Sequence, residues 1–214
     1  MNKGRRRFLR AFLSAMAAIL LVCTRALIVL AEAIRKVTPS NILGPFYRRG
    51  APMGTKLSPP GDKGTPLFIS GQVMNTEGKA LANVMVDVWQ ANAGGHYDND
   101  DPNNPPPPNV FRYRGVMKTD KDGNYAFETV VPGRYKLGDG HERPQHIHYM
   151  VSATGCKTLI TQLYFESDPY FEGNVEKNLH KDPFVQHREL VIPLAKDDKS
   201  KGFKGVFHIV LAKA

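Results

Sequence analysis

The sequence has little cysteine, a single tryptophan and fewer acidic than basic residues. Its 214 residues include only two cysteines, which excludes a disulfide-rich scaffold, so stability has to come from a hydrophobic core. A charged fraction of 23% and an apolar fraction of 42% exclude an intrinsically disordered chain. Acidic residues number 20 against 29 Lys and Arg, giving a formal net charge of +9. This length predicts one domain with a substantial core.

Long amphipathic helical patterns and internal repeats are also missing from the sequence. The 16 prolines and 19 glycines are many for a helical bundle but suit short strands joined by turns. We therefore predict an all-β protein, an antiparallel β-sandwich of about eight strands with long loops. An Asp-Gly pair at 122–123 predicts a hairpin turn. The predicted strands share β-rich composition and lie at 67–74, 83–91, 115–119, 125–131, 146–153, 159–165, 189–194 and 205–212.

Positive charge is concentrated at the N-terminus. Residues 1–33 contain six basic residues and one acid, and so carry five of the nine net positive charges. A basic start, the apolar or small run 11–24 and an A-x-A site at 31–33 have the layout of a signal peptide. Residues 5–10 fit the R-R-x-F-L-[K/R] core of a twin-arginine signal, which predicts a periplasmic or secreted bacterial protein and the twin-arginine export machinery as partner. The alternative is an uncleaved membrane anchor, which Arg25 disfavours.

The rest of the chain carries only the remaining +4, which gives no reason to infer nucleic-acid binding. Cys23 would leave with the signal peptide, and Cys156 alone cannot form an internal disulfide. Residues 34–66 are rich in Pro and Gly and lack strand or helix periodicity, so we expect an irregular arm that wraps a surface. The expected organisation is a signal peptide at 1–33, this arm, and a β-sandwich catalytic domain at 67–214.

The most informative segment is R-P-Q-H-I-H-Y-M-V, residues 143–151. Side chains two apart on a strand project from the same face about 7 Å apart, so His146 and His148 can converge on one metal ion while Ile147 packs behind. Taken alone, the pair fits a structural role equally well. A zinc hydrolase would need a third ligand and a general base, and Glu142 is the one carboxylate adjacent to the pair.

Two tyrosines stand at the ends of predicted strands near this segment. Tyr97 follows the strand that contains Trp89, and Tyr135 precedes the histidine pair. A phenol oxygen from either residue could complete a metal site. Each tyrosine is also an ordinary core or rim aromatic residue by position, and the residues alone leave both interpretations open.

Five short motifs follow one another between residues 89 and 165, within a resemblance to known proteins that spans about residues 38–212. They are W-Q-A-N-x-x-G-x-Y (89–97), T-D-x-x-G-x-Y-x-F (119–127), P-G-x-Y (132–135), R-P-x-H-x-H (143–148) and T-Q-L-Y-F (161–165). In this order they resemble the intradiol ring-cleaving catechol dioxygenases, particularly the protocatechuate 3,4-dioxygenase branch. The resemblance implies an oxidoreductase that inserts both atoms of O2 into a catechol-type aromatic diol. The ring would open between the hydroxylated carbons to a cis,cis-muconate-type product.

The resemblance also implies the composition of the site. A ferric ion, Fe(3+), would be held by Tyr97, Tyr135, His146 and His148. Phenolate oxygens suit ferric iron because hard anionic ligands prefer the higher charge, and the ion in turn favours the deprotonated phenol. Tyr135 would be the ligand that leaves when the diol binds. Arg143 would stabilise anionic charge on the substrate, and Gln162 would orient the reactants.

The segment T-P-S-x-x-x-G-P-F-Y, residues 38–47, resembles the arm that lines the substrate pocket of protocatechuate dioxygenases. Gly44, Pro45 and Phe46 are therefore expected to bind substrate together with Arg143. Family members associate, so a homo-oligomer is expected. Glu142 departs from the aromatic residue common in that branch, and a carboxylate facing the pocket would disfavour a carboxylated ring.

An alternative from another class is a secreted β-sandwich binding module without catalysis. Transthyretin-like and carboxypeptidase-regulatory-like domains share the pattern of residues 78–84 and the motifs at 119–127 and 132–135. That interpretation leaves R-P-x-H-x-H and the second tyrosine unexplained. We therefore favour the dioxygenase interpretation.

Overall fold

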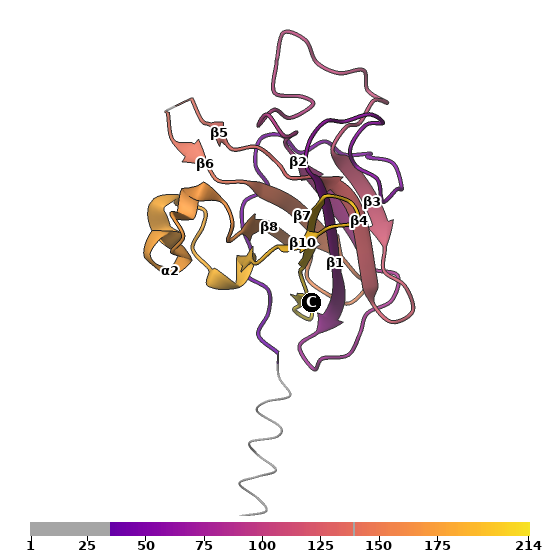
Figure 1. Ribbon diagram of the computed structural model, residues 1–214. Coiled ribbons are helices and arrows are strands. Elements are labelled where there is room, and N and C mark those ends of the chain that lie inside the picture. Colours follow the sequence, from indigo (N-terminus) through magenta and orange to yellow (C-terminus); the bar gives the residue numbers. More distant parts are fainter. Residues whose placement is uncertain (1–34, 139) are drawn as a thin grey trace, which may run out of the picture. The chain divides into compact units, whose positions relative to one another are not determined.

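The computed structural model describes residues 35–138 and 140–214, where almost all regular structure is β-sheet (Figure 1). One five-stranded sheet has β1 at its centre and contains β1 (Pro66–Asn75), β4 (Asn124–Val130), β10 (Ala195–Asp197), β11 (Gly202–Val206) and β12 (Ile209–Leu211). The second has the order β3 (Arg114–Lys118), β2 (Met85–Gln90), β7 (His146–Ser152), β8 (Leu159–Phe165) and β9 (Val191–Ile192).

The remaining elements are short. A separate two-stranded hairpin pairs β5 (Tyr135–Lys136) with β6 (Glu142–Arg143). Helical structure in the described residues consists of α2 (Val175–Asn178) and three 3-10 turns, at Pro169–Phe171, Leu179–Lys181 and Arg188–Leu190. The segment between β8 and β9 therefore turns repeatedly without forming a long helix.

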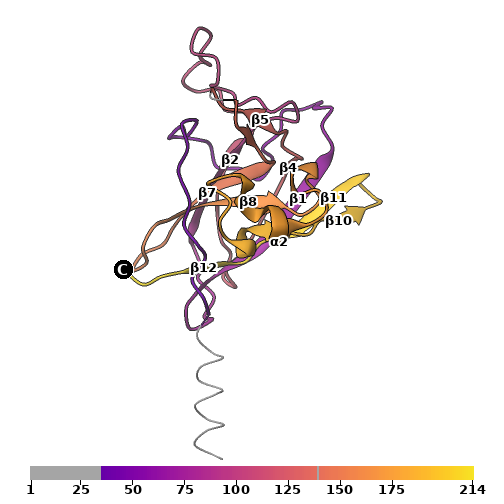
Figure 2. The ribbon, with the colours of Figure 1, turned by 90° about the vertical axis from the view of Figure 1, so that its left-hand side faces the viewer.

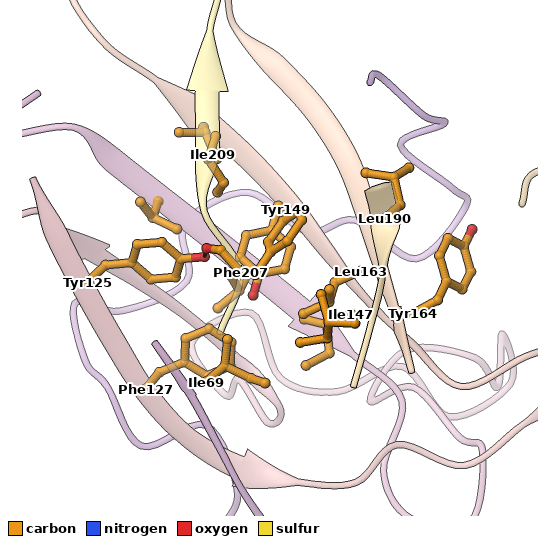
Figure 3. Packing of buried hydrophobic residues seen from close by; sticks show 14 of the residues in the cluster. Ile69, Tyr125, Phe127, Ile147, Tyr149, Leu163, Tyr164, Leu190, Phe207 and Ile209 are labelled. Carbon is orange, nitrogen blue, oxygen red and sulfur yellow. Dashed lines mark hydrogen bonds between the residues drawn. The ribbon is translucent and has the colours of Figure 1, made fainter. Parts of the chain in front are cut away.

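The two large sheets pack face to face around one hydrophobic core (Figure 3). Ile69 and Phe127 project from the first sheet, and Tyr149 and Leu163 project from the second. The ring of Tyr149 lies 6.2 Å from that of Phe127 and 5.3 Å from that of Phe207, centroid to centroid. Alternating buried positions along the strands supply this core, because successive side chains point to opposite faces. The predicted all-β sandwich is confirmed.

Strand pairing is mixed rather than wholly antiparallel. β1 runs parallel to β11 and to β12, and β8 runs parallel to β9. The predicted strand at 205–212 is split at Phe207 and His208, so its two halves belong to β11 and β12. This splitting and several strands of two or three residues raise the count in the described residues to twelve instead of about eight. A period-two pattern reports faces and carries no information about strand direction.

Two local predictions also need correction. The turn at Asp122-Gly123 is not a hairpin, because the flanking strands β3 and β4 lie in different sheets. It is a crossover between the layers, which a two-residue sequence signal cannot distinguish from a hairpin. The predicted strand at 189–194 begins as a 3-10 turn and yields only β9. Pro193 follows β9 and cannot donate to a sheet.

The central strand β7 is buried along both faces. Ile147 projects into the core, whereas His146 and His148 project from the opposite face and are 2% and 1% exposed. The arm covers this second side of the sheet, where the amide of Asn41 donates to the carbonyl of Ile160 on the adjacent β8 at 2.8 Å (Figure 2). The histidine pair is thus shielded from water by a segment remote in sequence.

Residues 36–65 contain no regular strand or helix and touch both sheets. The amide of Thr38 donates to the carbonyl of Val210 on β12, and the amide of Gly54 donates to the carbonyl of Val116 on β3. Residues 1–33, with the predicted signal peptide or anchor, lie outside the described residues. Within the described ranges, none of the helices is long and apolar enough to cross a membrane.

Removing core volume at Ile69 is expected to destabilise the protein. Ile69 is 1% exposed on β1, so Ile69→Ala leaves a cavity and should lower the free energy of unfolding by about 2–5 kcal/mol. Val206 on the neighbouring β11 is 55% exposed, and Val206→Ala should change it by less than about 0.5 kcal/mol. Urea denaturation measures both changes. Equal losses in the two variants would contradict the assignment of the core.

Candidate metal centre

The strand register places candidate site residues side by side on one face of the second sheet. His148 on β7 lies opposite Trp89 on β2 and opposite Gln162 on β8. His146, two residues earlier on the same face, lies opposite Tyr164. Because paired residues in adjacent strands project from the same side of a sheet, these residues form a single surface beneath the arm.

Two glycine-containing loops bring the tyrosines to this surface. Gly133 donates its amide to the carbonyl of Asn92 at 2.8 Å. A Cβ at Gly133 would lie 2.4 Å from the amide nitrogen of Gly95, and a Cβ at Gly95 would lie 2.2 Å from the carbonyl oxygen of Arg134. The loops therefore touch backbone to backbone, which only glycine allows. Tyr97 and Tyr135 follow this contact in their respective loops, and their rings meet edge to face at 5.6 Å.

Four polar atoms converge at one place. Nε2 of His148 lies 3.0 Å from Oη of Tyr97, and Nε2 of His146 lies 3.2 Å from both atoms. Oη of Tyr135 lies 3.5 Å from Nε2 of His146. Two donors that each bind a first-row metal ion at about 2.1 Å are about 3.0 Å apart at a right angle and about 3.4 Å apart at a tetrahedral angle. The spacing of these donor atoms therefore fits a metal ion.

The predicted ligand set is thus brought together, and its role as a ligand set stays a prediction. No group of three or more His, Cys, Asp or Glu side chains suited to a metal occurs in the described ranges. Besides the two imidazole nitrogens, the phenol oxygens of Tyr97 and Tyr135 are the atoms that could bind a metal ion here.

A backbone hydrogen bond fixes the orientation of His146. Its Nδ1 lies 2.6 Å from the carbonyl oxygen of Pro144. A carbonyl can only accept, so Nδ1 carries the proton and Nε2 presents its lone pair to the convergence point. The proline in R-P-x-H-x-H thereby contributes to the tautomer of the first histidine.

Packing rather than hydrogen bonding orients His148. Its Nδ1 has no hydrogen-bond partner within the described residues. The indole of Trp89 stacks on the imidazole at 4.9 Å and 7°. Gly44 of the arm approaches so closely that a Cβ there would lie 3.0 Å from Cε1 of the ring. An aromatic residue from the sheet and a glycine from the arm together hold the ring in place.

Burial controls the protonation of these four groups. It lowers the pKa of His146 to about 3 and that of His148 well below its usual value, with repulsion from Arg143 adding to both. Both imidazoles are therefore neutral at neutral pH and have lone pairs to donate. Burial also raises the pKa of Tyr97 and Tyr135. The phenols stay protonated unless a nearby cation reverses the balance, as a high-valent metal ion does.

Arg143 is buried beside the centre in a polar network. Its Nε donates to Oδ2 of Asp182 at 2.5 Å, and its Nη2 donates to Oε1 of Gln162 at 2.7 Å and to Oη of Tyr164 at 3.2 Å. Nε2 of Gln162 in turn donates to the carbonyl oxygen of Ile42 in the arm at 3.1 Å. The guanidinium and the amide predicted to be functional therefore occupy one network with fixed orientations.

The three arm residues predicted to bind substrate are placed differently. Gly44 lies against His148, and Phe46 stacks on Tyr97 with centroids 4.4 Å apart and contacts Tyr135 edge-on at 6.2 Å. Pro45 between them is exposed. Phe46 and Gly44 thus touch candidate ligands directly.

Besides Trp89, sequence reasoning missed Asp182 and Tyr164, which also shape the site. Asp182 is 0% exposed and forms the ion pair with Arg143, but it lies in a turn-rich segment that gave no motif. Tyr164 lies two residues after Gln162 on the same face of β8, so strand periodicity could have identified it. Glu142, whose orientation mattered for substrate choice, forms an ion pair with Arg134 at 2.8 Å and is 38% exposed.

Comparisons with known proteins identify relatives of this chain. A family model described as Dioxygenase matches residues 42–213. Catechol 1,2-dioxygenase 2 of Acinetobacter lwoffii is 38% identical over 149 residues, which cover 62% of this chain and 53% of that protein. The chain spans about half the length of the curated relatives it matches.

Two solved structures share the fold. The dioxygenase domain of a dioxygenase and carbohydrate-binding protein fusion from Streptomyces sp. SirexAA-E has a TM-score of 0.67 at 32% identity, covering 84% of this chain and 100% of that one. The 3-chlorocatechol 1,2-dioxygenase of Rhodococcus opacus has a TM-score of 0.71 at 28% identity, covering 87% and 76%.

Adding a methyl group at Gly44 is expected to weaken metal binding. Gly44→Ala would press on His148, whereas Gly61 has a similar φ of +79° against +76° and open space around it. Gly61→Ala therefore introduces the same backbone strain without the contact. We expect Gly44→Ala to lower the affinity of the candidate centre for added ferric ion by about 10–100-fold relative to Gly61→Ala. Iron content after dialysis against a graded chelator series measures this, and equal retention in both variants would contradict it.

Proposed function

The chain belongs to the intradiol ring-cleavage dioxygenase family, and we propose that it is a non-haem Fe(III)-dependent enzyme that inserts both atoms of O2 into a catechol-type aromatic diol. The ring opens between the two hydroxylated carbons, giving a cis,cis-muconate-type product. The convergence of two imidazole nitrogens and two phenol oxygens in one buried place is the observation that carries this proposal. The family match over residues 42–213 supports the reaction class.

In this proposal the ferric ion is held by Tyr97, Tyr135, His146 and His148. Neutral imidazoles with anionic phenolates suit a hard trivalent ion in a buried site, because phenolate charge compensates the charge of the ion. When bound, ferric iron draws electron density from a chelated catecholate and makes the ring reactive toward O2. A non-catalytic transthyretin-like module has no need to bury these four polar groups together.

The two tyrosines are suited to different tasks. Tyr97 is 4% exposed and is covered by Phe46, so it is the more firmly held phenol. Tyr135 is half-buried on the two-residue strand β5 and has more room to move. We therefore assign to Oη of Tyr135 the acceptance of one proton from the incoming diol. Of the four residues that would hold the ion, Tyr135 would be the one to give up its place to the substrate.

Arg143 supplies positive charge beside the reacting ring. Its guanidinium is held by Asp182 and Gln162 rather than by solvent, and its charge already acts to lower the pKa of Tyr135 against the larger effect of burial. A preoriented cation stabilises anionic character on the substrate without reorganisation during the reaction. Gln162 keeps the guanidinium aligned, and its amide is the second group that can orient a reactant.

The arm contributes the cover of the substrate site. Phe46 lies against both tyrosine rings, and Gly44 lies against His148. We assign these residues, with Pro45 and Arg143, to substrate binding. A diol that reaches the centre then contacts an apolar ring from the arm and a guanidinium from β6.

The export route is also part of the proposal. The basic start and the R-R-x-F-L-R run of residues 5–10 support export through the twin-arginine machinery to the periplasm or the medium, with an anchored form as the alternative. Such export suits a protein that acquires its metal before crossing the membrane. We further propose that the protein acts as a homo-oligomer, as family members associate.

Colour tests the metal centre. Tyrosinate-to-Fe(III) charge transfer should make the ferric protein burgundy. Tyr135→Phe is expected to keep its iron and shift the visible band, whereas His148→Ala is expected to lose iron. Tyr113→Phe is the control, because that hydroxyl donates to Asp62 and not to any of the four proposed ligands. Visible absorption and iron analysis check these outcomes, and a colourless chain that stays iron-free after ferric loading would refute the proposal.

Oxygen uptake with catechol, protocatechuate and hydroxyquinol tests the reaction and its substrate. At least one diol should be consumed in equal amount with O2, with the absorbance of a muconate appearing. The half-exposed pair between Glu142 and Arg134 predicts that Glu142→Gln changes the ratio of kcat/KM for protocatechuate to that for catechol by less than about threefold. A tenfold or greater change would place this carboxylate against the substrate.

A further inference from the structure

Asp98 is a buried carboxylate held between two arginines. Its side chain is 2% exposed, and those of Arg48 and Arg114 are 16% and 1% exposed. Nη1 of Arg48 donates to Oδ2 at 2.8 Å, and Nε of Arg114 donates to Oδ1 at 2.7 Å. The backbone amide of Arg112 adds a third donor at 3.2 Å. A carboxylate removed from water needs such partners, so the loss of one leaves charge uncompensated.

The position of this carboxylate links three parts of the candidate centre. Asp98 directly follows Tyr97 in the chain. Arg48 lies two residues after Phe46, whose ring stacks on Tyr97 at 4.4 Å. Arg114 lies opposite Trp89 in the β2–β3 pair, and that indole stacks on His148. A single ion-pair network therefore joins the arm, the tyrosine loop and the sheet.

Arg48 makes its polar contacts with one loop. Besides Asp98, it donates to the carbonyl oxygens of Val110 at 2.9 Å and Pro107 at 3.3 Å. Its guanidinium also lies over the ring of Phe111 at 4.5 Å. These contacts tie the arm to the proline-rich segment that begins at Asp98. None of these partners belongs to the hydrophobic core between the two large sheets.

We propose that Arg48 and Asp98 form a clamp that keeps the arm docked over Tyr97 and thereby keeps the substrate site assembled. Both are positioning residues, since Arg48 acts through Phe46 and Asp98 acts through its neighbour Tyr97. The clamp rests on the proposed function for its role in catalysis. Its effect on the arm is a property of the protein by itself and is measured independently.

Trp89 provides a direct probe of arm docking. It is the one tryptophan in the chain, it is 1% exposed, and the ring of Tyr47 from the arm covers it at 4.8 Å. Tyr47 immediately precedes Arg48, and its hydroxyl donates to Oδ2 of Asp87 on β2 at 3.0 Å. Loss of the clamp leaves this bond as the neighbouring polar anchor, so the ring of Tyr47 leaves the indole more often. Acrylamide quenching of tryptophan fluorescence therefore reports whether the arm is docked, and it needs no substrate.

The test compares Arg48→Met with Arg49→Met in the purified full-length chain at matched iron content. Arg49 is exposed and makes no hydrogen bond or ion pair within the described part of the chain. Arg48→Met is expected to increase quenching of Trp89 by about threefold through more frequent local opening. It should raise KM for the diol by about tenfold with kcat changed less, because the site must be reassembled on binding. Arg49→Met should match the wild type.

Two further variants separate positioning from general stability. Arg48→Lys keeps the charge and should restore most of the protection of Trp89, although a lysine lacks the fork that reaches two acceptors. Asp98→Asn should loosen the arm and also shift the visible tyrosinate band, because it adjoins Tyr97.

The outcomes are distinct. The clamp is refuted if Arg48→Met and Arg49→Met show the same quenching of Trp89 and the same KM. This holds even if Arg48→Met lowers the free energy of unfolding, because the ion pair then has a purely structural role. The clamp is supported if quenching increases in Arg48→Met and returns toward the wild-type value in Arg48→Lys. If the wild-type protein cleaves no diol, this result still supports the clamp, and only the proposed function fails.

Discussion

The structure depends on the cost of burying four polar side chains at one place. Two imidazoles and two phenols meet beneath the arm with their polar atoms 3.0–3.5 Å apart. Groups removed from water in this way are stable only when they bond to one another or to an ion. The strand register, the glycine contact between the two tyrosine loops and the cover by the arm all serve to satisfy this constraint.

The four groups are supported by different means, and the differences suit a reaction centre. A backbone carbonyl fixes the tautomer of His146, while stacking and a glycine contact hold His148. Tyr97 is covered by Phe46, whereas Tyr135 lies half-buried on a two-residue strand. Three of the donors are therefore firmly held, and Tyr135 has more freedom. Such an arrangement suits a centre in which one phenol oxygen gives way to substrate. Arg143 adds a fixed positive charge beside them.

Strand periodicity and motif order predicted the β-sandwich and the grouping of the candidate ligands. The alternation of His146, Ile147 and His148 predicted a pair of side chains on one face with an apolar residue behind, and the structure has this arrangement. Parallel pairing of β1 with β11 and β12 was not predictable, because the pattern reports faces and not partners. The role of Asp182 was equally hidden, since its contact with Arg143 spans 39 residues and depends on turns without a motif.

The sequence by itself determined that the chain forms a β-sandwich, which residues can donate to a metal, and where proline and glycine turns must fall. These properties follow from local alternation, side-chain chemistry and backbone restriction, all of which act over a few residues. Only the tertiary structure decided that Gly44, Phe46 and Arg48 of the arm reach His148, Tyr97 and Asp98. Contacts between such distant segments depend on how the sheets and loops pack, because burial and charge pairing are satisfied by the whole fold at once.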